Sequence, residues 1–164
     1  MSFSAEEDRM LLRISTTEDS EYHLWLTRRF VKVLWGALIE TMERDPQLNK
    51  TLLPEVRNAI MGMRHQEAIA ASDFNQPHQD GKRTLTSNTG PLLVTSGTVT
   101  PLKDGATRLL FNTSDGTGID FSLNDKLTHA LCQLIISSSQ NAGWDLDLSV
   151  GDPNVIAVDK SVVH

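Results

Sequence analysis

The chain is poor in cysteine, with Cys132 as the only one among 164 residues. A single cysteine excludes an intramolecular disulfide, so nothing indicates an oxidising compartment. Cys132 lies in an apolar segment with helical spacing. Inert packing is the expected role there, because a reactive thiol needs a lowered pKa.

Long apolar runs are also missing. No stretch approaches the roughly 20 apolar residues that a membrane span requires. The N-terminus, MSFSAEEDR, lacks the cationic start and apolar run of a signal peptide. We therefore expect a cytoplasmic protein with no membrane partner.

Signatures of catalysis and metal binding are absent as well. The sequence contains no glycine-rich phosphate loop, HExxH, paired CxxC or GxSxG motif. Residues 115–120 (DGTGID) resemble a calcium loop, but Lys126 stands where the bidentate glutamate is needed, so a hairpin turn is sufficient. His78 and Asp80 are too few for a metal site, which needs three or four ligands. We predict no catalytic residues, no metal site and no cofactor.

Charge is present but unevenly spread. The net charge of −6 makes the chain a poor general binder of nucleic acid, since affinity for phosphate comes from cations. Residues 23–64 hold seven bases and four acids, which keeps a local cationic surface open. A hydrophobic content of 39% and a charged content of 22% are ordinary for a globular chain.

The segment 17–45 has the strongest pattern. Its apolar residues recur every three or four positions, which predicts one long helix with a buried face. Thr16 or Thr17 would cap its start, and Asp45 before Pro46 would mark its end. The apolar positions are Tyr22, Leu26, Phe30, Val33, Leu34, Ala37, Leu38 and Met42.

The opposite side of this helix carries the predicted interaction surface. A helical wheel places Trp25, Arg28, Arg29 and Lys32 there, and tryptophan and arginine are enriched at binding hot spots. A solvated helix face, with Trp25 covered by another part of the chain, is the alternative interpretation. His23 falls on the apolar side, where a structural role is favoured.

The remaining strands are marked by composition and turns. Residues 9–15 (RMLLRIS) form a short apolar run that indicates a strand. Residues 91–100, 107–113 and 118–123 are rich in apolar and β-branched residues, with Asp-Gly turns between them. They predict a three-stranded antiparallel meander.

Two further helices have clear start signals. Pro54 suits the first position of a second helix, where its missing donor has no cost. Asn124 is a good cap for a third helix, and Gly143 suits its end.

These elements predict an α+β fold in the order strand-helix-helix-strand-strand-strand-helix. We expect an antiparallel sheet of three or four strands, covered on one face by helices that include the long N-terminal one. The first strand should join the meander, because a lone strand is unstable. Residues 1–148 are assigned to a single domain with a mobile polar loop near 75–90, and residues 149–164 to a C-terminal tail.

These features favour a non-enzymatic protein-interaction or regulatory module, acting as a homo-oligomer or adaptor. A nucleic-acid-associated factor that uses the basic face and stacks bases on Trp25 is the alternative, although no RRM, KH or helix-turn-helix pattern supports it. A weaker alternative is an enzyme with an unrecognised site, which predicts that at least two histidines meet in one pocket. The candidates are His23, His65, His78 and His129.

Overall fold

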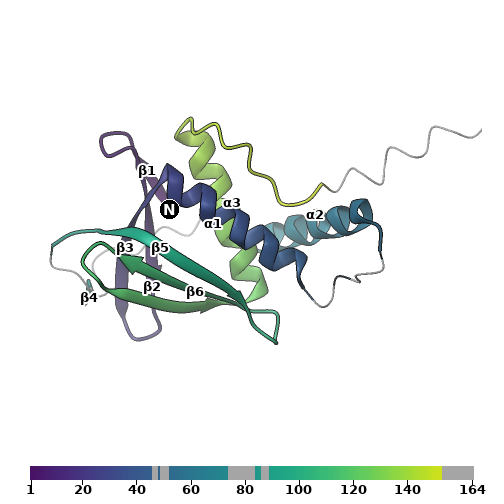
Figure 1. Ribbon diagram of the computed structural model, residues 1–164, viewed down its shortest axis with the longest axis horizontal. Helices are drawn as coiled ribbons and strands as arrows, with labels where there is room; N and C mark the ends of the chain where they lie inside the picture. Colours follow the sequence, from purple (N-terminus) through teal and green to yellow (C-terminus); the bar gives the residue numbers. More distant parts are fainter. Residues whose placement is uncertain (46–47, 49–51, 74–83, 86–88, 153–164) are drawn as a thin grey trace, which may run out of the picture.

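A computed structural model of the chain describes residues 1–45, 48, 52–73, 84–85 and 89–152 (Figure 1). Within these residues the fold is α+β, with a mixed sheet and three helices. Six strands lie in the order β1-β2-β3-β5-β6-β7, and the short β4 pairs with β3 beside this path. The strands are β1 (Ser2–Ser4), β2 (Arg9–Ser15), β3 (Ser20–Thr27), β4 (Thr84–Leu85), β5 (Leu92–Pro101), β6 (Thr107–Thr113) and β7 (Gly118–Leu123).

The predicted antiparallel sheet of three or four strands is wrong in both size and direction. Most neighbouring strands are antiparallel, but β3 runs parallel to both β4 and β5. The first apolar strand, β2, pairs with β1 and β3 rather than with the meander. β3 is the strand that joins the N-terminal hairpin to the meander.

The predicted long N-terminal helix is also wrong. Its first part is β3, and the helix α1 spans only Arg28–Glu43. Along β3 the side chains of Leu24 and Leu26 are fully buried. They lie on the same face as Tyr22 because side chains two apart share one side of a strand. A helix would place Leu24 outside the apolar stripe, although its side chain is buried. A strand period of two residues therefore accounts for the buried side chains of this segment better than a helical period of three to four.

The N-terminal hairpin shows why the strand form is stable. Met10 pairs with Leu26 across it, and Leu12 pairs with Leu24, so all four apolar side chains enter the core together. Thr16, expected as a helix cap, instead closes the turn, where its backbone N–H donates to the Ser20 carbonyl at 2.9 Å.

The predicted meander is confirmed. β5, β6 and β7 are consecutive antiparallel neighbours. Every second residue of β6 is buried, beginning at Thr107 and ending at Thr113. At the second turn, Asp115 accepts hydrogen bonds from the hydroxyl of Thr113 and the backbone N–H of Thr117. The Asp115–Gly116 segment is therefore a hairpin turn, as expected.

Of the three helices in the described residues, α1 and α3 contact the sheet, whereas α2 packs against α3 and α1 and extends away from the strands (Figure 1). The helix α1 buries Val31, Leu34 and Leu38. The other two are α2 (Pro54–Ala70) and α3 (Asp125–Asn141). Their predicted start signals are confirmed, since Pro54 begins α2 and the Asn124 side chain accepts from the Leu127 N–H at 2.8 Å. None of the helices in the described residues is both long and apolar enough to cross a membrane.

The segment after α3 first contacts the N-terminal residues and then runs to α2 (Figure 1). Trp144 is buried, with its ring 5.8 Å from that of Phe3 in an edge-on arrangement. Its indole N–H donates to Asp8 at 2.9 Å. Residues 149–152 of the predicted tail are described, and Val150 among them is buried. The rest of the tail lies outside the described residues, and so does most of the loop predicted near 75–90.

Candidate interaction site

The four residues predicted to form an interaction surface lie on two different elements. Trp25 is half-buried on β3, whereas Arg28, Arg29 and Lys32 are exposed in the first turns of α1. The helical wheel therefore does not apply to Trp25. The register of the sheet nevertheless places Trp25 beside Leu93 of β5.

A groove runs between α1 and β5, with a volume of about 590 Å³. One wall is a side of α1 that includes Arg29 and Val33, and the other is formed by β5 residues between Leu93 and Val99. Val33 was assigned to the buried stripe of the long helix. Its exposed fraction is instead 67%, so a large apolar side chain is open to solvent beside the groove.

The groove follows an unpaired edge of β5. This strand pairs with β3 at Leu92 and Leu93, and beyond that point no strand among the described residues lies on that side. Leu93 and Val94 both line the groove, although successive side chains point to opposite faces of a strand. The groove therefore lies along the edge of β5 rather than over one face of the sheet.

Gly97 allows the backbone of β5 to lie close to the ring of Phe111, which contacts α1. A Cβ on Gly97 would lie 2.9 Å from Cδ1 of Phe111 on β6. Phe111 in turn contacts Phe30 of α1, with ring centroids 5.5 Å apart. The register of β5 and β6 also shifts between Val94 and Ser96. The bulge and the glycine bring Phe111 under the start of α1, which fixes this helix beside the strand.

The α1 end of the groove is electropositive. The first turn of α1 contains no acidic side chain to balance the positive end of the helix dipole. Arg28, Arg29 and Lys32 add three cations in the same region. This end of the groove therefore attracts negative charge.

A second group of titratable side chains joins α2 to α3. His65 and His129 are buried, with their Nδ1 atoms 3.1 Å apart, so one ring donates a hydrogen bond and the other accepts it. Gln133 lies 3.3 Å from Nε2 of His65, and Asp125 lies 3.7 Å from Nε2 of His129.

Burial is the main cause that lowers the pKa of both histidines. The neighbouring His129 lowers the pKa of His65 further. Asp125 opposes the effect on the pKa of His129, and Arg64 adds to it. His129 and Asp125 border a cavity of about 40 Å³, which is room for a water molecule. The group forms a hydrogen-bonded contact between α2 and α3.

Two of the four candidate histidines therefore meet, although the enzyme alternative stays untested. His23 lies on β3, where it hydrogen-bonds to Glu21, and His78 is outside the described residues. The only cysteine is no nucleophile for the pair, because burial raises the pKa of Cys132 to about 12. The part of the chain that the structure describes holds no cluster of three histidine, cysteine or carboxylate side chains that fits a metal ion.

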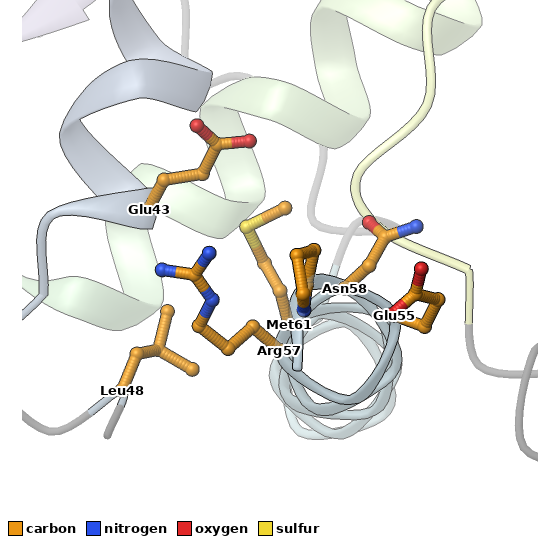
Figure 2. A pocket seen from close by; sticks show the side chains of 7 residues that line it. Glu43, Leu48, Glu55, Arg57, Asn58 and Met61 are labelled. Carbon is orange, nitrogen blue, oxygen red and sulfur yellow. The ribbon is translucent and has the colours of Figure 1, made fainter. Parts of the chain in front are cut away.

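Figure 2 shows another pocket, of about 460 Å³, at the start of α2. Arg57 extends along it, and its Nε is buried with no hydrogen-bond partner among the residues that the structure describes. Glu43 and Glu55 also line this pocket, so it carries charges of both signs and favours neither an anionic nor a cationic ligand. Residues 46–47 and 49–51, which flank its lining residue Leu48, are outside the described residues.

No family model, curated protein or solved structure matches the chain, so the geometry alone bears on function. Sequence reasoning selected the cations of α1 but missed the edge of β5 and the exposure of Val33. A signal for the edge was present. Thr95, Ser96, Gly97 and Thr98 are small or polar side chains within a strand and are all exposed, which is typical of a strand with an open side.

Proposed function

We propose that this chain is a non-enzymatic protein-interaction module that binds a partner through the groove between α1 and β5. The observation that carries the proposal is the exposed apolar side chain of Val33 beside an unpaired strand edge. Open edges are templates for pairing with another chain, and exposed apolar side chains lose unfavourable hydration on contact. Arg28, Arg29 and Lys32 border this surface and select the charge of the partner.

The proposal covers both an adaptor and a homo-oligomer. The nucleic-acid alternative has less support, because Trp25 is half-buried on β3 and is not part of one helix face with the three cations. An oligonucleotide needs accessible aromatic rings beside its phosphate contacts.

Site-specific photo-crosslinking in cells tests the proposal. A photoreactive amino acid at Val33 should give discrete protein adducts. The same group at Leu127 on α3, whose exposed fraction is 50%, is the matched control at an exposed site that does not line the groove. Adducts of twice the chain mass would identify self-association. Equal labelling at the two positions, or nuclease-sensitive adducts at Val33, would contradict a protein-interaction module.

A further inference from the structure

We propose that the groove binds an extended, acidic segment of another protein, which pairs with β5 as an added strand. This inference rests on the proposed function and names the class of its partner. Three features carry it, namely the backbone of β5, the apolar side of α1 and the charge at the start of that helix.

The backbone of β5 supplies the pairing. In a strand, alternate N–H and C=O groups point to each side, and β6 occupies one side of β5. Residues 95–97 and 99 line the groove, so we infer that their N–H and C=O groups on the side away from β6 face it. Thr95, Ser96 and Gly97 are exposed, and Ser96 and Gly97 have little or no side chain to hinder an approaching strand. Strand addition to an open edge takes its affinity from such main-chain hydrogen bonds.

The dimensions limit the segment to a short one. Five residues of β5, from Thr95 to Val99, span roughly 17 Å at about 3.3 Å per residue. The added segment therefore contributes about five residues to the pairing. Its side chains would alternate, and those on the α1 side would contact Val33 and Phe30. Apolar residues at every second position suit that side.

The cations at the start of α1 favour acidic residues at the remaining positions of the added segment. Arg29 lines the groove, and Arg28 and Lys32 are exposed beside it. A second copy of this chain is a poorer occupant. The β5 edge of a second copy would bring the same three cations of α1 and not an opposite charge, and like charges across an interface are unfavourable. An acidic segment meets the opposite charge without that repulsion.

Selection from a displayed library of random eight-residue peptides tests the inference with the full chain. The expected binders combine aspartate or glutamate with apolar residues at alternate positions. Synthetic copies of these binders are then compared with copies in which lysine replaces each acid. Further copies carry N-methyl groups on alternate backbone nitrogens. Both changes should abolish binding, the first through charge and the second through the lost main-chain hydrogen bonds.

Three variants locate the binding. Arg29→Glu and Val33→Asp should each raise the Kd of the selected acidic peptides by about tenfold or more, which corresponds to about 1.4 kcal/mol. Leu127→Asp on α3, at an exposed position that does not line the groove, should leave the Kd unchanged. Amide hydrogen exchange of residues 95–99 should slow when the acidic peptide is bound.

The outcomes separate this inference from the proposed function. Failure to enrich acidic peptides, or binding that leaves exchange in β5 unchanged, overturns the inference. A dimer that Val33→Asp converts to a monomer, without peptide binding, also overturns it in favour of a second copy. In either case a protein adduct at Val33 in cells would leave the proposed function intact. Peptide binding without a cellular adduct would instead count against the proposed function, and with it against the inference that rests on it.

Discussion

At the scale of single residues, Gly151 determines how the C-terminal segment contacts α2. Its φ of +61° is a conformation that side chains other than glycine rarely adopt. A Cβ there would lie 2.4 Å from both the Asn58 carbonyl oxygen and the Gly62 nitrogen. The next residue, Asp152, donates its backbone N–H to the same carbonyl at 3.3 Å. Two glycines thus allow one backbone to lie directly on another.

Replacing Gly151 with alanine should therefore destabilise the protein. Backbone strain at such a φ costs about 1–3 kcal/mol, and the steric clash adds to it. Gly143→Ala is the matched control, because Gly143 has a φ of +64° with open space around it. Urea unfolding should show a larger loss of unfolding free energy for Gly151→Ala. Equal losses would mean that the close contact with α2 contributes nothing.

At the scale of elements, the boundary between β3 and α1 depends on a helix cap. The Thr27 hydroxyl accepts a hydrogen bond from the Phe30 N–H at 3.2 Å. The residues before it pair with β2, so the backbone cannot be helical there. The cap satisfies one of the free N–H groups at the start of α1 and ends the strand in the same residue.

Thr27→Ala should lower the unfolding free energy by about 1 kcal/mol, the usual effect of removing such a cap. Thr17→Ala should have little effect, because Thr17 is exposed and precedes β3 rather than a helix. Thermal unfolding followed by circular dichroism measures both. A larger decrease in stability for Thr17→Ala than for Thr27→Ala would support the single long helix that the periodicity predicted.

The contact between α2 and α3 should depend on pH. The folded state lowers the pKa of His65 and His129 below the ordinary value of 6.5. Below that value the unfolded chain binds more protons than the folded chain. The stabilising contribution is therefore present above about pH 6.5 and is lost as the pH falls toward the lowered pKa values of the folded state.

Acidification from pH 7 to pH 5 should thus lower the Tm, and the decrease should be smaller in His65→Gln. The variant leaves one histidine and a neutral neighbour, so the repulsion between two imidazolium groups disappears. Thermal unfolding at both pH values measures the difference. An identical decrease in the variant would assign the pH dependence to other groups.

At the scale of the whole molecule, the groove exists because β3 pairs with the start of β5 only. Among the described residues, the rest of that edge of β5 has no neighbouring strand. β3 covers the first two residues of β5, and the chain then leaves the sheet as α1. The edge of β5 is left open next to a helix whose buried side holds Leu34, with an exposed fraction of 3%. Val33, its neighbour in sequence, is exposed on the groove side.

This arrangement predicts that substitutions at two adjacent residues change the unfolding free energy by very different amounts. Leu34→Ala should destabilise the protein by about 2–5 kcal/mol, as expected for a core leucine. Val33→Ala should change the unfolding free energy by less than about 0.5 kcal/mol, as expected for a surface position. Urea unfolding of both variants is the measurement. A destabilising Val33→Ala would mean that this side chain is covered and the groove is closed.

Local signals were sufficient for much of the second half of the fold. The meander and α3 follow from turns, alternation and the Asn124 cap, which act within a few residues of the elements that they define. The cations of the candidate site could also be selected, because their types and spacing are local. Trp25 was placed by a helical wheel that its strand conformation does not obey.

The sequence by itself determined that the chain is α+β, where its later elements begin and which cations stand together. Only the tertiary structure decided that residues 20–27 are a strand, that β3 runs parallel to β5, and that His65 meets His129. These features depend on partners that are distant in the chain. The pairing of β3 with β2 outweighs a local helical pattern, and the open edge of β5 exists only where β3 turns into α1.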